Sequence, residues 1–326
     1  MKAVLCVRHG PPEALELADL PDPVPGPGEV VVEVSAIGLN FFDTLIIRDL
    51  YQQKPELPFS PGGEFSGRVV ALGEGVTFPK PGARVCGYLS YGAARERVVA
   101  RADRLAVVPD DLDLVRAAGL IVTYGTSLYA LRDRGDLKPG ETLAVLGAAG
   151  GVGLAAVELG KILGARVIAC ASSADKIAFA RAHGADVGLD YTQEDLKARL
   201  KELGGADGID VVFDPVGGEQ SEQALRALGW CGRLLVIGFA AGEIPKLPLN
   251  LLLLKNCDAR GVAFGTQARR DGAWLTAAIA ELMDYARAGR ISAHVDATFP
   301  LARCAEALAE IAGRRVKGKV VLTTGL

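Results

Sequence analysis

The sequence has few residues of the kinds that bind metals or form disulfide bonds. Six cysteines and three histidines are scattered through 326 residues, with no C-x-x-C pair and no Cys/His cluster. Their spacing predicts neither a structural zinc site nor a disulfide framework. We therefore expect each of them to be an ordinary packed or surface side chain, and we expect no bound metal.

The sequence also lacks a strong net charge and a long apolar run. A net charge of −3 and an isoelectric point near 5.8 leave no basic footprint for nucleic acid or an anionic membrane. Apolar runs such as Leu249–Leu254 are too short to span a bilayer, and no signal-peptide pattern opens the sequence. We expect a cytoplasmic protein without a nucleic-acid or membrane partner.

The first part of the chain is rich in strand and turn signals. The length exceeds what one hydrophobic core usually holds, which favours two domains. The Pro-rich segment 21–28 excludes a helix. The expected strands are Met1–Val7, Val30–Ile37, Gly62–Leu72 and Gly82–Tyr88. This pattern predicts an antiparallel, barrel-like domain.

From about Ile121, helical and strand patterns alternate. Helices are expected over Val152–Leu163, Ala174–His183, Gln193–Leu203 and Trp274–Ala288. The expected strands are Leu143–Leu146, Arg166–Ala171, Val187–Leu189, Ile209–Phe213, Arg233–Ile237 and Ala259–Ala263. Six strands with helical crossovers predict an α/β fold with a Rossmann-type doubly wound parallel sheet. A further strand, Lys317–Thr323, is expected to return to the first domain.

A glycine motif follows the first of these parallel strands. Ala148-x-Gly150-x-x-Gly153 lies between the apolar run 143–146 and a helical pattern. In this context, glycines allow a tight turn, close approach to a pyrophosphate and close helix packing. The motif predicts a dinucleotide site; the alternative is a purely structural glycine turn.

The end of the second parallel strand carries no acid. An Asp or Glu there would bind the ribose 2′-hydroxyl of NADH, but the sequence reads Cys170-Ala171-Ser172-Ser173, with Lys176 shortly after. Small hydroxyls with a lysine suit a 2′-phosphate, so we expect NADPH. The alternative is that Lys176 is a solvated helix lysine, and the neighbouring Asp175 is a mild argument for that.

Four motifs together carry a family resemblance over the whole length. The chain resembles a zinc-free medium-chain dehydrogenase/reductase of the quinone oxidoreductase (zeta-crystallin-like) branch. The motifs are Gly38-Leu39-Asn40-Phe41-Phe42-Asp43, Pro61-Gly62-Gly63-Glu64-Phe65-Ser66-Gly67, Tyr124-Gly125-Thr126 and Ala148-Ala149-Gly150-Gly151-Val152-Gly153. Gly63 stands where the zinc-dependent relatives have a metal-binding His, and Asn40 occupies the turn of their catalytic Cys. The resemblance therefore implies no catalytic zinc.

The resemblance also implies domains and site residues. The barrel, of the GroES-like type, would comprise 1–121 and 289–326, and the NADPH-binding domain 122–288. Asn40, Asp43 and Tyr51 would line the nicotinamide cleft, although the first two also suit turn and cap positions and Tyr51 suits a half-buried aromatic. The implied cofactor-binding residues are Thr126, Gly150, Gly151, Val152, Gly153, Ser172, Lys176, Tyr191, Gly238, Phe239, Phe264, Arg314 and Lys319; for Phe264 the alternative is plain packing.

Three functions agree with these residues. The first is NADPH-dependent reduction of a quinone, the second reduction of an enone or enoyl thioester, and the third a non-catalytic NADPH-binding or structural role. Without zinc, a saturated alcohol lacks its Lewis acid, whereas a quinone or conjugated carbonyl delocalises the developing charge. The apolar stretch Pro245–Leu254 beside the last strands further predicts a homodimer, with burial within the monomer as the alternative.

Overall fold

The computed structural model describes residues 1–326. The chain divides into two compact units, which we call the barrel unit (Met1–Gly125, Gly265–Gly289 and Ala293–Leu326) and the nucleotide unit (Thr126–Phe264 and Arg290–Ser292). The predicted combination of a doubly wound parallel sheet with an antiparallel barrel-like sheet is confirmed. The domain boundaries proposed from the sequence, 1–121 with 289–326 and 122–288, stay a prediction.

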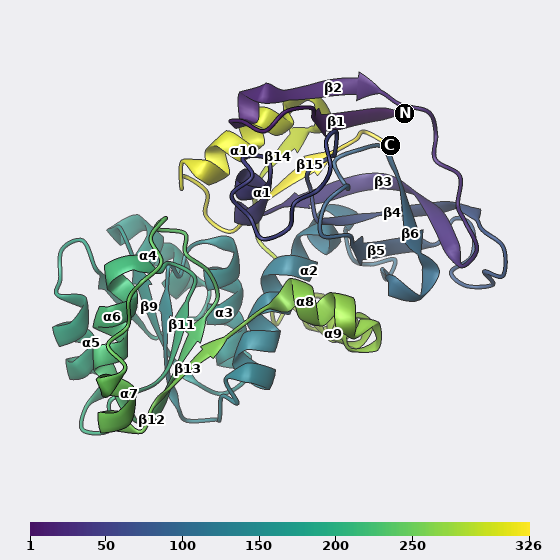
Figure 1. Cartoon of the computed structure of the whole chain (residues 1–326). Coiled ribbons are helices and arrows are strands. Elements are labelled where there is room, and N and C mark those ends of the chain that lie inside the picture. Colours follow the sequence, from purple (N-terminus) through teal and green to yellow (C-terminus); the bar gives the residue numbers. More distant parts are fainter. The chain divides into compact units, whose positions relative to one another are not determined.

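The nucleotide unit contains a six-stranded parallel sheet in the order β10-β9-β8-β11-β12-β13 (Figure 1). Its strands are β8 (Thr142–Leu146), β9 (Arg166–Ala171), β10 (Val187–Asp190), β11 (Ile209–Asp214), β12 (Leu228–Val236) and β13 (Asp258–Gly261). The strand order reverses between β8 and β11, which pair directly in parallel. In folds of this class, the reversal point marks a crevice at the carboxyl ends of the strands where ligands bind.

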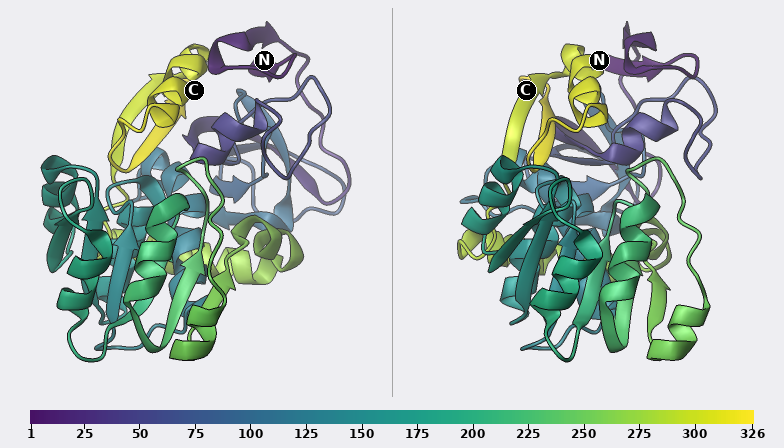
Figure 2. Two further views of the ribbon diagram at one scale, coloured as in Figure 1. Left: turned by 60° about the vertical axis from the view of Figure 1, so that its left-hand side comes forward. Right: turned by 90° about the vertical axis from the view of Figure 1, so that its left-hand side faces the viewer.

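Helices cover both faces of this sheet, as Figure 2 shows. They are α3 (Gly151–Ile162), α4 (Ala174–Ala182), α5 (Leu196–Gly204), α6 (Gly218–Ala227) and α7 (Asn250–Lys255). Alternate strand residues point to opposite faces. Leu146 and Ile168 share a core with Leu200 of α5 and Leu225 of α6. Gly160 of α3 packs on the other face, against the side chain of Leu143.

Local capping explains where some of these helices begin. The predicted helix Gln193–Leu203 starts later, at Leu196, because the Asp195 carboxylate accepts a hydrogen bond from the Ala198 backbone N–H at 2.8 Å. The predicted strand Arg233–Ile237 begins earlier, at Leu228. The apolar pattern of Pro245–Leu254 indicates no helix, whereas α7 forms over Asn250–Lys255.

The barrel unit is built on a sheet in the order β14-β15-β3-β4-β5-β7, with β6 also paired to β3. Its strands are β3 (Glu29–Leu39), β4 (Glu64–Leu72), β5 (Arg84–Tyr88), β6 (Arg97–Arg101), β7 (Leu105–Val107), β14 (Val295–Pro300) and β15 (Lys319–Thr323). A separate hairpin joins β1 (Lys2–Cys6) and β2 (Leu15–Asp19). All pairings are antiparallel except β14 with β15.

Helices complete the barrel unit and lead out of it. They are α1 (Phe41–Ile46), α8 (Phe264–Arg270), α9 (Gly272–Arg287), α10 (Cys304–Ala312) and α2 (Leu114–Leu128), whose last residues belong to the nucleotide unit. The helical stretch Leu114–Arg134 is long and apolar enough to cross a membrane by length and composition alone. Because 78% of its most apolar window is buried inside the protein, this stretch has the character of a core helix.

Candidate functional site

The glycine turn after β8 is built by three glycines with distinct tasks. Gly147 adopts φ +61°, a left-handed conformation that favours glycine. Gly150 is the N-cap of α3, with extended backbone. At Gly153, an added Cβ would lie 2.1 Å from the Gly147 carbonyl oxygen, so the helix and the turn approach too closely for any side chain. Gly147 therefore makes the sharp turn. The motif read from the sequence begins at Ala148 and does not include this glycine.

The N-terminus of α3 suits a phosphate. The first intrahelical hydrogen bond runs from Leu154 N–H to the Gly150 carbonyl at 2.8 Å. The N–H groups of Gly151, Val152 and Gly153 precede that bond and have no acceptor within the helix. This turn therefore fits a dinucleotide pyrophosphate by its backbone geometry.

Ser172 and Lys176 lie beside the carboxyl end of β9. Lys176 Nζ donates to Ser172 Oγ at 3.3 Å, and Ser173 caps α4 by accepting from Lys176 N–H at 3.3 Å. Tyr191 directly follows β10 at the same edge of the sheet. The structure thus brings the predicted adenosine-end residues to neighbouring strand ends.

The loop after β11 packs directly against the glycine turn. Asp214, 2% exposed, accepts from Val216 N–H at 2.9 Å, from Gly217 N–H at 3.0 Å and from the Ser221 hydroxyl. A Cβ added at Gly147 would lie 3.2 Å from the Val216 side chain. Asp214 therefore holds a loop that forms one wall of the turn.

The remaining predicted cofactor residues of the nucleotide unit lie at or near the ends of its elements. Gly238 and Phe239 follow β12, and a Cβ at Gly217 would lie 3.0 Å from the Phe239 ring. Thr126 is buried within α2, and Phe264 is buried at the start of α8. Their contacts with a cofactor stay a prediction.

Asn40 and Asp43 form the N-terminus of α1 in the barrel unit. Asn40 is the N-cap, and Asp43 Oδ2 accepts from Asn40 N–H at 2.8 Å in a capping box. Asp43 Oδ1 accepts from Gly62 N–H at 2.9 Å. Burial raises the pKa of Asp43 to about 7, although these two N–H groups and the charge of Lys319 favour the carboxylate. Both residues thus cap α1, as the alternative interpretation expected. Their catalytic roles stay a prediction.

Tyr51 belongs to an aromatic and polar cluster of the same unit. Its ring stacks on Phe42, with centroids 5.4 Å apart and an interplanar angle of 25°. Burial, and then the charge of Asp43, raises the pKa of Tyr51, so its phenol stays protonated near neutral pH. Burial raises the pKa of Tyr88 to about 12, and Tyr51 and Arg269 act electrostatically on it. Tyr88 and Arg269 are neighbours that sequence reasoning did not find.

Lys319 is turned inward. Its side chain is 5% exposed and its Nζ bonds both Glu64 and Asn40 Oδ1. Arg314, the other basic residue predicted for the cofactor wall, is exposed after α10 and has φ +55°. The structure therefore separates this predicted pair into one buried and one exposed cation.

The position of the zinc-binding His of related enzymes is filled by packing. A Cβ at Gly63 would lie 2.7 Å from the Phe42 ring and 3.1 Å from the Ser90 carbonyl. A histidine there would have to displace that ring. Across the chain, no group of three or more His, Cys, Asp or Glu side chains is arranged to hold a metal ion.

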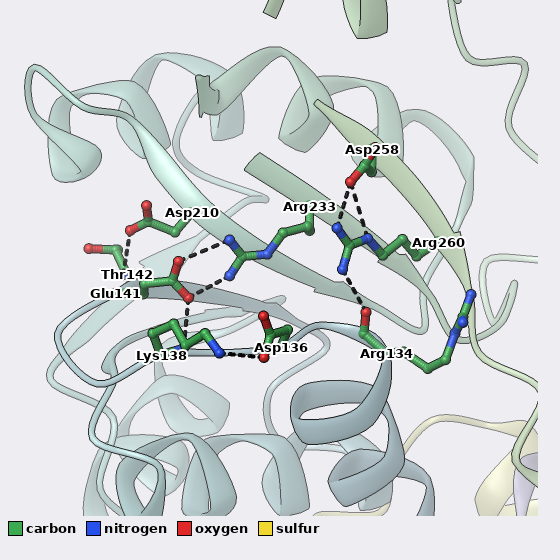
Figure 3. A network of polar contacts seen from close by, with 9 residues as sticks. All are labelled: Arg134, Asp136, Lys138, Glu141, Thr142, Asp210, Arg233, Asp258 and Arg260. Carbon is green, nitrogen blue, oxygen red and sulfur yellow. Dashed lines mark hydrogen bonds and ion pairs between the residues drawn. The ribbon is translucent and has the colours of Figure 1, made fainter. Parts of the chain in front are cut away.

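A hollow of about 290 Å³ lies at the amino-terminal side of the parallel sheet, beside β12 and β13. Its cations are already paired, as Figure 3 shows. Arg233 forms a two-pronged ion pair with Glu141, Arg260 lies 2.6 Å from Asp258, and Lys138 pairs with Asp136. This balanced network leaves no excess charge for a phosphate.

Comparisons with known proteins agree with this geometry. Residues 26–110 match the family model of the alcohol dehydrogenase GroES-like domain, and residues 151–281 match that of the zinc-binding dehydrogenases. Quinone oxidoreductase-like protein 2 of Rattus norvegicus is 38% identical over 99% of this chain and 92% of its own length. The chain belongs to the quinone oxidoreductase family of medium-chain dehydrogenases/reductases.

Other members of the quinone oxidoreductase family extend the comparison. The quinone oxidoreductase of Pseudomonas aeruginosa is 36% identical over 98% of this chain and 99% of its own. The solved structure of Escherichia coli quinone oxidoreductase complexed with NADPH is 32% identical, with a TM-score of 0.92 over 99% of this chain and all of that one. The resemblance inferred from the motifs is confirmed, and the protein is an enzyme of the oxidoreductase class.

Proposed function

We propose that this protein is an NADPH-dependent quinone oxidoreductase that transfers hydride to a quinone or conjugated carbonyl without zinc. The observation that carries the proposal is the glycine turn Gly147–Gly153 with Ser172 and Lys176 beside it. The turn fits a pyrophosphate, and the hydroxyl and lysine fit a 2′-phosphate where an acid would repel it. The complex of the Escherichia coli relative with NADPH supports the same cofactor.

The chain's own residues would bind and orient the reactants. Backbone N–H groups of α3 hold the pyrophosphate, Lys176 and Ser172 hold the 2′-phosphate, and the loop fixed by Asp214 supports the turn. NADPH, when bound, supplies a hydride from its nicotinamide ring. The protein's main contribution is then positioning.

Tyr51 is proposed to donate a hydrogen bond to the oxygen that gains negative charge. Its raised pKa keeps the donor proton on the phenol, and the stacked Phe42 ring fixes its plane. A neutral donor stabilises a delocalised enolate or hydroquinone anion but does not ionise a saturated alcohol near pH 7. This is why we propose quinones and conjugated enones, rather than simple alcohols, as substrates.

Zinc independence rests on residue types. Asn40 and Gly63 supply neither a thiolate nor an imidazole at the positions that bear the ligands in zinc-dependent relatives, and Phe42 fills the space beside Gly63. Activity should therefore be unchanged after treatment with a strong chelator. Loss of activity to the chelator, restored by one equivalent of zinc, would contradict this part of the proposal.

A substrate panel tests the reaction. NADPH oxidation is followed with a benzoquinone, a conjugated enone, an enoyl thioester and a primary alcohol with NADP⁺. We expect turnover of the quinone or the enone and none of the alcohol. Exclusive use of the enoyl thioester would favour the enoyl-reductase alternative, and no turnover of any acceptor would contradict the proposed reductase.

A further inference from the structure

A buried ion pair of the barrel unit, Lys319 with Glu64, holds the side-chain amide of Asn40. Lys319 Nζ contacts Asn40 Oδ1 and Glu64 Oε1, and Asn40 Nδ2 donates to the same Glu64 Oε1 at 2.9 Å. Glu64 is fully buried, and Asn40 is 8% exposed. Both ends of one amide are therefore held by the two members of a buried ion pair.

The sheet register places these three residues together. Val320 of β15 pairs with Leu39 of β3, so Lys319 lies at the next position toward Asn40. On the other side of β3, Glu64 of β4 pairs with Gly38. The end of β3 is thus flanked by a lysine on one neighbouring strand and a glutamate on the other.

Glu64 is itself fixed by a helix. Its Oε2 accepts from Val122 N–H of α2 at 2.7 Å. A Cβ at Gly38 would lie 2.6 Å from Glu64 Oε1 and 2.5 Å from the Ala118 carbonyl. Gly38 is therefore required for the carboxylate to lie against the strand.

We propose that Lys319 is a positioning residue that fixes the orientation of the Asn40 amide, and not a direct ligand of the cofactor. A cation contacting Oδ1 and a carboxylate contacting Nδ2 allow only one of the two amide orientations, since the flipped amide would set donor against donor and acceptor against acceptor. The other Nδ2 hydrogen has only the Gly38 carbonyl near it, at 3.5 Å, which is too long for a strong bond. That hydrogen is the one a reactant oxygen would take.

The inference rests on the proposed function, because Asn40 matters only if a reactant is reduced there. A direct ligand of a phosphate is expected to be exposed and to contribute to NADPH affinity. Lys319, 4% exposed and bonded to Glu64, has neither the access nor the spare charge for that task. Its removal should therefore reduce turnover and leave NADPH affinity within about twofold, because binding groups elsewhere are intact.

A double-mutant cycle with Asn40 tests the proposal in the full chain. Lys319→Met should lower the single-turnover rate with benzoquinone about as much as Asn40→Ala does, on the order of a hundredfold. In the Asn40→Ala background, Lys319→Met should cost less than about threefold more, since both changes remove the same oriented amide. Multiplicative losses, or a tenfold loss of NADPH affinity with an unchanged rate, would overturn the proposal.

Three further variants guard against a folding defect. Lys319→Arg keeps a buried cation and should therefore retain more of the single-turnover rate than Lys319→Met does. The double variant Lys319→Met/Glu64→Gln has no unpaired buried charge, so its folding stability should recover while its single-turnover rate stays low. Lys317→Met, two residues earlier on the same segment and outside the cluster, should match wild type. Recovery of the rate in the Lys319→Met/Glu64→Gln variant would contradict a positioning role.

A readout without substrate separates this inference from the proposed function. In the free protein, the two Asn40 side-chain amide protons should have chemical shifts in ¹H–¹⁵N spectra that are displaced from those of a solvated amide, and Lys319→Met should move them toward the solvated values. Unchanged signals would overturn the inference. If the wild-type protein reduces no acceptor, the proposed function fails. The positioning role of Lys319 is then decided separately, by whether Lys319→Met shifts the Asn40 amide signals.

Discussion

Lys176 Nζ lies 3.3 Å from Ser172 Oγ, at the carboxyl end of the second parallel strand. Together they form a small polar site at the place where an acid would bind a plain ribose. We expect this pair to determine the preference for NADPH over NADH.

The first prediction is that Lys176→Ala abolishes most of the preference for NADPH. An ion pair between lysine and a 2′-phosphate at a partly exposed site contributes about 1–3 kcal/mol, which is roughly a five- to hundredfold preference. The measurement is the ratio of dissociation constants for NADPH and NADH by fluorescence titration. Lys197→Ala, on the exposed start of α5, is the control. An unchanged ratio in Lys176→Ala would remove this lysine from the cofactor site.

The second prediction separates two glycines of one turn. Gly153→Ala forces a Cβ to within 2.1 Å of the Gly147 carbonyl, whereas at Gly150 the same Cβ would lie 3.4 Å from that oxygen. Gly153→Ala should lower the free energy of unfolding by about 1–3 kcal/mol, as overpacking does. Gly150→Ala should leave stability nearly unchanged and weaken only NADPH binding. Chemical denaturation and NADPH titration of both variants check this, and equal stability loss in the two would contradict it.

The third prediction concerns the pH dependence of stability. The pKa of Asp43, raised by burial to about 7 in the folded state, exceeds its unfolded value. The folded state therefore binds a proton that the unfolded state releases between about pH 4 and pH 7, and stability from this group falls as the pH rises through that window, by at most about 1.4 kcal/mol per unit.

Asp43→Asn isolates that dependence. The amide supplies one acceptor for the two N–H donors of Asn40 and Gly62, so the variant should be less stable at every pH. The difference in unfolding free energy between wild type and Asp43→Asn should shrink from pH 4.5 to pH 7.5. A difference that grows over this range would show that the carboxylate, rather than the neutral acid, is the stabilised form.

The fourth prediction is that the protein is a homodimer through the nucleotide unit. Leu249, Leu253 and Leu254 are 74%, 82% and 68% exposed, so burial within the monomer does not account for them, and β13 is an edge strand beside them. Light scattering at micromolar concentration should give twice 34.0 kDa. Leu253→Asp should give the monomer, and Val24→Asp, equally exposed in the barrel unit, should not. A 34.0 kDa species in wild type would end this prediction.

Much of the nucleotide unit was predictable because its signals are local. The run Leu143–Leu146 with the glycines that follow it specifies a strand, a turn and a helix within about twenty residues. The absence of an acid after β9 and the presence of Lys176 are likewise visible in a few adjacent letters. What the motif missed is the turn made by Gly147, since that task is known only from its backbone conformation.

The barrel-unit cluster was not predictable, because its members are brought together by sheet pairing. Lys319 is 255 residues from Glu64, and no local sequence pattern indicates that the two residues are in contact. The family resemblance implied that Lys319 is a cofactor-binding residue, and the structure shows where it lies, buried against Asn40 and Glu64. Short helices such as α1 were missed for a related reason: the Asn40–Asp43 capping box stabilises a helix too short to show a periodic pattern.

The most direct test of the central claim is single-turnover hydride transfer from bound NADPH, observed by the loss of reduced-nicotinamide absorbance in the near ultraviolet. The acceptors are a benzoquinone and a conjugated enone, each mixed with wild type and with Tyr51→Phe. The account predicts transfer in wild type and, in Tyr51→Phe, a rate lower by about a hundredfold with NADPH affinity unchanged, because the ring remains and only the donor is lost. An unaffected variant would remove Tyr51 from the mechanism, and no transfer to either acceptor by wild type would contradict the reductase function itself.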